Sequence, residues 1–398
     1  MFLICFSNFN NTIITLYIFK TYSYIDMDAT SDLTIHNGKL TILAVFGHGG
    51  ELDKTQLKML IGSEVIAERW NKPIEIEKAE GVAVIVAGSG KITCNATMYT
   101  DIFAAGVSIL RTEIEIRDKI SLNDILIALH SNTIMVEGLD YQSYANKRIK
   151  EIREKINPVK TVAYHPDIKK FIFLKIKDFT PQLDPKSLRE QYGEIIARFL
   201  SGETSIRPLH SKEIMEKTAN DLSYYDEDFF LASTEGAFII GCDGYINELR
   251  ELLELAISLL LLFQIYDRKI DLEISNAFEA LKKLNSSRYY FITQVPRKLE
   301  KSLFMVSEIG LVILDDIKDL MNPHKITNDW YYQSFYQKML DTLKVRDYGK
   351  LVQEKIDSLQ DLYSTARELS TEQLALWLEV SIVLLILWEV IKPIIQLL

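Results

Sequence analysis

The sequence predicts an α+β protein, in which a mixed-sheet α/β domain is followed by an all-helical domain that ends in a hydrophobic tail helix. Three observations predict this class. Strand-like runs and helical patterns alternate up to about residue 180, the pattern is helical from residue 245, and residues 374–398 form the most apolar window of that length. Short crossovers and tight turns between strands favour helices packed on a mixed sheet over a doubly wound parallel sheet.

The composition is that of a globular protein and restricts the possible partners. The chain has 398 residues, 48% of them hydrophobic and 25% charged, which is enough for two domains with buried cores. A net charge of −10 argues against a nucleic-acid-binding surface. Cys5, Cys94 and Cys242 are far apart and odd in number, which indicates neither a disulfide framework nor a zinc site. We expect no metal and no cofactor.

The chain divides into five segments by composition and pattern. The first is mostly Phe, Ile, Asn, Tyr and Thr, lacks the features of a signal peptide, and is expected to be an upstream extension that precedes a start at Met27. The predicted segments are the extension 1–26, the α/β domain 27–180, a connector with a hairpin 181–244, the helical domain 245–373 and the tail 374–398.

Periodicity predicts the elements of the α/β domain. Ser121 is expected to cap a short helix because a hydroxyl accepts a hydrogen bond from the first turn. We expect strands at 39–46, 74–77, 82–87, 92–99, 106–117 and 132–139, two more within 161–179, and helices at 121–130 and 141–156. A glycine-containing turn at 88–91 is expected to close a hairpin.

Gly47, His48, Gly49 and Gly50 form a turn between a predicted strand and a helical pattern. Such a turn can hold a phosphate group at a helix N-terminus. The dinucleotide fingerprint nevertheless fails, because Leu52 stands where the third glycine belongs. A plain tight turn is the simpler interpretation, and an anionic ligand at this turn is the alternative.

The middle of the chain contains an acidic run and a buried helix. We expect 229–233 and 237–242 to pair as a hairpin. The acidic residues at 226–228 alternate between two faces of an extended chain, which favours a solvated edge over a metal site. The helix predicted at 248–266 has a charge-free run too short to span a bilayer, so we expect it in a core, with a break at 267–271.

Residues 351–370 carry a coiled-coil-like seam. Val352, Ile356, Leu359 and Tyr363 recur at alternating spacings of four and three, with polar residues on most other faces. The seam packs either within its own helical domain or against a partner chain, and the pattern alone does not choose between them.

The tail is expected to be a single-pass membrane anchor. Glu379, Glu389 and Lys392 interrupt it, but its Leu, Ile and Val residues offset that cost on insertion scales. Glu389 and Lys392 share a helical face and are expected to pair. The alternative is a buried C-terminal helix.

The C-terminal region resembles the "required for meiotic nuclear division" family. The resemblance rests on pairs and runs at 329–330, 335–336, 343–345, 351–356, 378–379, 382–386 and 389–390. Tyr348 and Gln353 depart from the family pattern. The resemblance implies an α/β domain, a helical domain, a C-terminal transmembrane helix, self-association and, in organelles, support of membrane-linked translation with a ribosome-associated partner.

These observations favour a non-enzymatic, tail-anchored, self-associating membrane scaffold, with the bulk of the chain in the cytoplasm. No catalytic set of residues is recognisable in the sequence. The alternative is a soluble cytoplasmic binding protein or enzyme for an anionic ligand, which would use the turn at 47–50.

Overall fold

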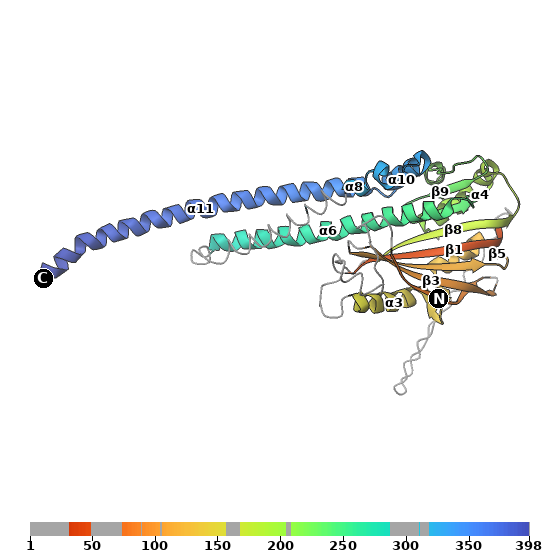
Figure 1. Cartoon of the computed structure of the whole chain (residues 1–398), viewed down its shortest axis with the longest axis horizontal. Coiled ribbons are helices and arrows are strands. Elements are labelled where there is room, and N and C mark those ends of the chain that lie inside the picture. The colour runs from red at the N-terminus through yellow and green to blue at the C-terminus, as the bar shows by residue number, and fades with distance from the viewer. Residues whose placement is uncertain are drawn as a thin grey trace, which may run out of the picture. The chain divides into compact units, whose positions relative to one another are not determined.

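The computed structural model describes residues 32–48, 74–88, 90–103, 106–156, 168–203, 208–286, 310 and 318–397, and in the two long helices only part of the side chains. The proposed start at Met27 lies outside these residues, as do Gly49 and Gly50. The described part has a large mixed sheet followed by a helical region (Figure 1). The predicted mixed α/β class with a helical C-terminal region is therefore confirmed.

Within the described residues, ten strands form one sheet in the order β7-β6-β2-β3-β4-β1-β8-β10-β9, with β5 paired to β1. All described pairings are antiparallel except that of β10 with β8, which makes the sheet mixed. The strands are β1 Thr34–Gly47, β2 Ile74–Ala87, β3 Gly90–Phe103, β4 Val107–Ile116, β5 Ile120–Ser121, β6 Ile134–Val136, β7 Leu139–Asp140, β8 Ile168–Thr180, β9 Phe229–Ala232 and β10 Gly236–Ile240.

Helices cover both faces of the sheet (Figure 1). Side chains alternate along β1, so Ile42 and Ala44 belong to one core, and Leu43 and Val45 to the other. The first core contains α2 Leu122–His130, α3 Tyr141–Ile156 and α4 Pro185–Ser201. The second contains α6 Ile246–Ser286, α10 Trp330–Thr342 and α11 Val345–Leu397. The remaining described helices are α5 Ser211–Ala219, α8 Lys318–Leu320 and α9 Pro323–Ile326.

Most local predictions for the α/β region are confirmed. Ser121 caps α2 by accepting a hydrogen bond of 3.0 Å from the Asp124 N–H, and α3 has the predicted bounds. Both predicted hairpins form, as β2–β3 and β9–β10. Cys94 and Cys242 are buried free thiols. The structure differs at β2, which is one strand instead of two. β8 confirms the second of the two strands expected within 161–179, and the first, before Pro166, lies outside the described residues.

α6 is one helix of 41 residues, so the break predicted at 267–271 is wrong. Asp267 and Asp271 lie one helical turn apart and both reach Lys355 of α11, at 2.6 and 2.7 Å. The two carboxylates are therefore paired without interrupting the helix. The apolar part of α6 is buried in the second core, as the sequence predicted.

The tail is likewise not a separate apolar helix, which corrects that part of the predicted fold. It is the last part of α11, a continuous helix of 53 residues. α6 and α11 run in the same direction, because Phe263 faces Gly349 and Asp271 faces Lys355. Figure 1 shows the two helices side by side.

A buried charge cluster joins α6 to the sheet. Nη1 of Arg111 on β4 lies 3.1 Å from Oε1 of Glu254 on α6 and 3.1 Å from Oδ2 of Asp101 on β3. The Glu254 side chain is completely buried and that of Arg111 is 8% exposed. The guanidinium also lies over the ring of its cross-strand neighbour Tyr99, 4.3 Å from the centroid.

Further charges balance this cluster. Glu113, two residues along β4 on the same face, accepts hydrogen bonds from Lys39 at 2.7 Å and from Arg250 at 3.2 Å. Arg250 Nε also lies 3.5 Å from Oε1 of Glu254, one turn further along α6. Lys39, Arg111 and Arg250 thus face Asp101, Glu113 and Glu254, so each carboxylate of this cluster has a cation within ion-pair distance.

The first prediction removes the central cation. Arg111→Leu leaves the buried Asp101 and Glu254 short of a positive partner, so we expect it to lower the free energy of unfolding by about 3–5 kcal/mol. Denaturant titration measures the loss. The control is Arg117→Leu, whose side chain is 72% exposed and which should change stability by less than about 1 kcal/mol. Equal effects of the two variants would show that the cluster does not hold α6 to the sheet.

The second prediction concerns pH. Burial raises the pKa of Glu254 to about 7, against the attraction of Arg111 and Arg250. The folded state therefore holds a proton that the unfolded chain, with a pKa near 4.5, has lost, so this group lowers stability as pH rises from about 4.5 to 7. Relative to Glu254→Gln, the wild type should lose up to about 3 kcal/mol across this window. Parallel stability–pH curves for the two proteins would contradict the prediction.

Candidate functional site

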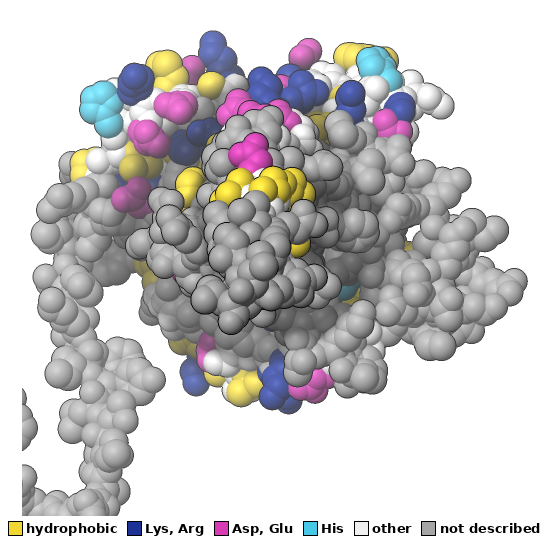
Figure 2. Space-filling view, turned by 90° about the vertical axis from the view of Figure 1, so that its left-hand side faces the viewer, with side chains coloured by type: hydrophobic (Ala, Val, Ile, Leu, Met, Phe, Trp, Pro, Cys, Tyr) yellow, Lys and Arg dark blue, Asp and Glu magenta, His cyan; other side chains and the backbone are white. Residues whose placement is uncertain are grey.

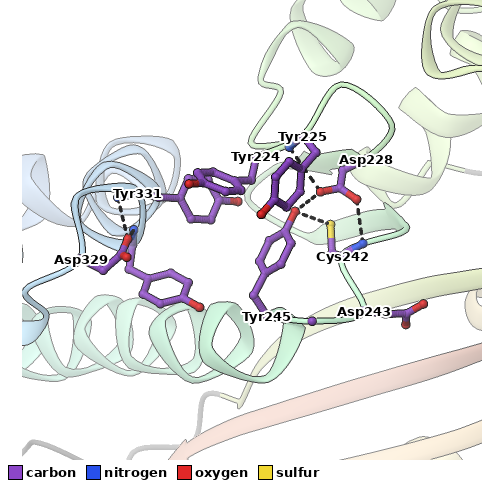
Figure 3. Close-up of a pocket in the computed structure, with 10 residues that line it drawn as sticks. Tyr224, Tyr225, Asp228, Cys242, Asp243, Tyr245, Asp329 and Tyr331 are labelled. Carbon is purple, nitrogen blue, oxygen red and sulfur yellow. Dashed lines mark hydrogen bonds between the residues drawn. The ribbon is translucent and has the colours of Figure 1, made fainter.

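A pocket of about 410 Å³ lies where three segments of the chain meet (Figure 3). They are the segment before β9, with Tyr224 and Tyr225, the β10–α6 connection, with Tyr245, and the start of α10, with Tyr331 and Tyr332. The volume is within the range of about 300–1,000 Å³ that is usual for small-molecule sites. Five tyrosines at one pocket make this the candidate site.

The start of α10 is fixed by its cap. Oδ1 of Asp329 accepts hydrogen bonds from the N–H groups of Tyr331 and Tyr332, at 2.9 and 3.2 Å. This is the usual role of an aspartate before the first helical turn. The Tyr331 hydroxyl also donates to the Leu222 carbonyl at 2.8 Å. The backbone N–H and the hydroxyl of Tyr331 are thereby both held, and its ring becomes a fixed wall of the pocket.

Asp228 organises the opposite wall. Its Oδ1 accepts a hydrogen bond of 2.9 Å from the Cys242 N–H, and its Oδ2 accepts one from the Tyr245 hydroxyl (Figure 3). The turn before α6 makes this possible, since Gly241 and Cys242 both have positive φ, at 79° and 61°. A Cβ at position 241 would lie 2.5 Å from Oδ1 of Asp228, so only glycine fits there.

The rings contact one another at tilted or edge-to-face angles. Tyr224 lies 4.3 Å from Tyr331 and 4.5 Å from Tyr225 between ring centroids, the second pair being T-shaped. Tyr245 and Tyr331 are also T-shaped, at 5.7 Å. Tilted rings present their faces in several directions around one space, and such pairs stabilise the arrangement by about 0.5–1.5 kcal/mol each.

The ionisable groups of the pocket are poor nucleophiles. Burial raises the pKa of the Cys242 thiol to about 12, and burial and the hydrogen bond to Asp228 raise the pKa of Tyr245 far above its ordinary value. Both groups therefore stay protonated at neutral pH, whereas the thiolate is the reactive form of cysteine. Asp243 pairs with Lys175 at 2.5 Å, which lowers its pKa, and Figure 3 shows it directed away from the tyrosines.

Few features of the sequence point to this pocket. The acidic run at 226–228 was predicted to be a solvated edge. Asp226 and Glu227 are indeed exposed, but Asp228 is only 9% exposed. The local signals were the Gly-Cys-Asp-Gly turn and two Tyr-Tyr pairs, and nothing in the sequence joins the pairs, which are more than a hundred residues apart.

The predicted ligand turn at 47–50 is only partly described. Gly47 ends β1, and its carbonyl accepts a hydrogen bond of 3.0 Å from Arg153 Nε. His48 is completely buried, with Nδ1 2.8 Å from the Ser108 hydroxyl and its backbone N–H donating to the Gly106 carbonyl at 2.9 Å. An anionic ligand at this turn stays a prediction, with Gly49 and Gly50 outside the described residues.

The seam predicted at 351–370 packs within its own chain. Val352, Ile356 and Leu359 are at most 1% exposed and belong to the core built around α6. Packing of the seam within its own helical domain is therefore confirmed, and a coiled coil with a partner chain is wrong, because the helix that the seam contacts is α6 of the same chain. The side chain of Tyr363 lies outside the described residues.

Beyond this contact α11 exposes an apolar stretch, which we call the 378–386 segment. Asp271 of α6 pairs with Lys355 of α11, which is 84 positions later in the chain. Because the two helices run in the same direction, the end of α6 at Ser286 corresponds to residue 370 of α11, before the segment begins. Its seven large apolar side chains are 48% to 64% exposed: Leu378, Val380, Ile382, Val383, Leu384, Leu385 and Ile386. Glu379 is exposed as well. In Figure 2 hydrophobic side chains gather near the middle of the face shown.

Within the described part of the chain, no helix carries a stretch that is both long enough and apolar enough to cross a lipid bilayer. The predicted single-pass membrane anchor is therefore wrong. The physical reason lies in the charges at 379, 389 and 392, which divide the apolar residues into short runs. The predicted pair of Glu389 and Lys392 involves side chains outside the described residues.

Fold and pocket together define a mixed-sheet α/β protein with a tyrosine-lined, ligand-sized pocket and a long helical extension. Residues 10–246, more than half of the chain, match the family described as "Uncharacterized protein MJ0711, N-terminal domain", and the chain belongs to this family. The matched region ends where α6 begins.

The uncharacterized protein MJ0711 of Methanocaldococcus jannaschii is 24% identical over 213 residues, which are 54% of this chain and 63% of that protein. The chain thus covers less than two thirds of the length of this relative. No solved structure matches the chain. The resemblance to the "required for meiotic nuclear division" family is wrong, because the matches are to MJ0711 and its N-terminal domain and none indicates the other family. The translation role and the ribosome-associated partner lose their basis with it.

The third prediction tests the contact between α11 and α6. Ile356→Ala removes a side chain that is 1% exposed, so we expect a loss of about 2–5 kcal/mol in the free energy of unfolding. Leu351→Ala is the control, because Leu351 on the same helix is 41% exposed and should cost less than about 1 kcal/mol. The loss should not depend on protein concentration, since the partner helix is in the same chain. A concentration-dependent loss would instead indicate a contact between chains.

Proposed function

We propose that this chain is a non-catalytic assembly protein whose copies associate through the 378–386 segment of α11. The observation that supports this function is the exposure of seven large apolar side chains in nine consecutive residues. Contiguous apolar patches on a protein surface usually mark an interaction site. A second copy of the chain is a suitable partner because it carries the same apolar stretch.

The arrangement of these side chains favours a helical bundle. Leu378, Ile382 and Leu385 follow one another at spacings of four and three and share a helical face, while Val380, Val383 and Leu384 lie on other faces. A helix that is apolar on two opposite faces is stable only when both faces are covered. One partner helix covers a single stripe, so each copy is expected to contact more than one other.

The energies lead to the same conclusion. Complete burial of one large aliphatic side chain contributes about 1.5–3 kcal/mol, so the half-exposed side chains of the segment retain roughly 1 kcal/mol each, or roughly 7 kcal/mol for each copy. Association costs an estimated 4–15 kcal/mol. A pair of copies joined by one stripe is therefore marginal, whereas a bundle that buries several stripes is favourable.

The body of the chain would follow its helix into the assembly. α11 packs along α6 through Val352 and Ile356, and α6 is joined to the sheet through the Glu254–Arg111 pair. The assembled segments would thus hold copies of the α/β region, and with them copies of the tyrosine-lined pocket, around one bundle.

The fourth prediction tests assembly. The double variant Ile382→Glu/Leu385→Glu places two carboxylates on the apolar stretch, so we expect it to sediment as a monomer where the wild type forms a larger species. Met215→Glu is the matched control, because Met215 on α5 is 71% exposed and lies outside the segment. Sedimentation velocity over a range of protein concentrations provides the measurement.

Salt gives a second readout of the same proposal. Each copy has a net charge of −10, so copies repel one another, and moderate salt should shift the wild type towards the larger species. A wild type that stays monomeric at every concentration and salt level would overturn the proposal. So would a double variant that assembles as well as the Met215→Glu control.

A further inference from the structure

We propose that the tyrosine-lined pocket binds a small organic cation of the alkylammonium class. The proposal is independent of assembly through α11, since all residues of the pocket belong to other parts of the chain. It rests on three features of the pocket: carboxylates that no Lys or Arg of the described residues pairs with, tyrosine rings at mutual angles, and a volume suited to a small ligand.

The carboxylates give the pocket a negative charge. Asp228 is 9% exposed and is held by the Cys242 N–H and the Tyr245 hydroxyl, both of which are neutral donors. Asp329 is held by backbone N–H groups of α10. Among the side chains that the structure describes, no Lys or Arg lies within ion-pair distance of either carboxylate, in contrast to Asp243 with its Lys175. A buried charge held only by neutral donors favours a cationic ligand.

The negative charge of these carboxylates also affects the neighbouring tyrosines. The pKa of Tyr332 is raised by burial and by the charges of Glu248 and Asp329, and the pKa of Tyr331 is raised by burial with a contribution from Asp228. The N-termini of α6 and α10 act in the opposite direction, each with about half a unit of positive charge. Asp329 and Glu248 sit at these two helix ends and offset them, so the balance remains negative.

The rings supply a second attraction that selects the kind of cation. The face of an aromatic ring attracts an alkylammonium group within about 6 Å of its centroid, and several rings around one space form the cage that recognises methylated ammonium ions. Neighbouring rings among Tyr224, Tyr225, Tyr245 and Tyr331 have centroids 4.3–6.2 Å apart, at interplanar angles of 52° to 86°. Figure 3 shows their rings gathered beside Asp228.

The same residues disfavour a metal ion. Calcium requires six to eight oxygen ligands, and magnesium a near-octahedral set. Both oxygens of Asp228 are already engaged, and Asp329 lies on another segment as a helix cap. No group of three or more His, Cys, Asp or Glu among the described residues is arranged to hold a metal ion. An organic cation needs no such ligand set, because ring faces and a distant carboxylate are sufficient.

The fifth prediction compares a cation with its neutral isostere. Calorimetric titration of the full-length protein should show binding of choline, and of tetramethylammonium as the minimal probe, at millimolar concentration or below. 3,3-Dimethylbutan-1-ol has the shape of choline without its charge, and it should bind at least about tenfold more weakly. Inorganic phosphate should not bind at the pocket. Equal affinity for choline and the alcohol, or binding of phosphate but of neither cation, would overturn the proposal.

Variants locate the binding. Tyr225→Leu removes a ring that is 60% exposed and should weaken choline binding about tenfold, whereas Tyr225→Phe keeps the ring face and should stay within about threefold of the wild type. Asp329→Asn removes a charge while asparagine still caps α10, so we expect several-fold weaker binding with an unchanged melting temperature. Choline affinity that is the same in Tyr225→Leu, Asp329→Asn and the wild type would place the cation elsewhere and refute the assignment.

Discussion

The buried contact of Arg111 with Glu254 sets the position of the first long helix on the sheet. It joins the fourth strand to the first long helix where both are buried, and charges on three strands and one helix balance around it. A buried ion pair contributes little net stability, but loss of one partner is costly. Its main effect here is to fix the position of α6 on the sheet. Apolar contacts between α6 and the sheet are not directional and allow several positions of the helix along the strands. The guanidinium of Arg111, held between carboxylates, selects one of these positions.

That position determines the others. α6 packs on the sheet with one side and along α11 with another, and its first turn follows Tyr245, which forms a wall of the pocket. Asp228 reaches the turn before α6, and α10 brings Asp329 and Tyr331 from the other side. The family match ends at residue 246, so it includes Asp228 and Tyr245 but not the α10 wall. The pocket is thus completed by a part of the chain beyond the matched domain.

Elements that depend on residues close together in the chain could be predicted from the sequence. Ser121 accepts its hydrogen bond from a residue three positions away, the β9–β10 hairpin closes over a short turn, and α3 shows the helical period throughout. In the candidate site the cap at Asp329 and the glycine turn at 241 are local in the same sense. Burial of α6 also followed from the sequence, because its long apolar run must be covered in any globular fold.

Local sequence patterns account for most of the strands and helices and for the faces of them that are apolar. What covers those faces depends on contacts between distant parts of the chain. Asp267 and Asp271 allow α6 to continue because Lys355 lies beside them, the 351–370 seam meets α6 instead of a partner chain, and Asp228 is buried because Cys242 and Tyr245 fold over it. The physical reason is the same in each case. Periodicity and capping are properties of neighbouring residues, whereas the partner of a charge or an apolar stripe is chosen by packing between residues that are far apart in the chain.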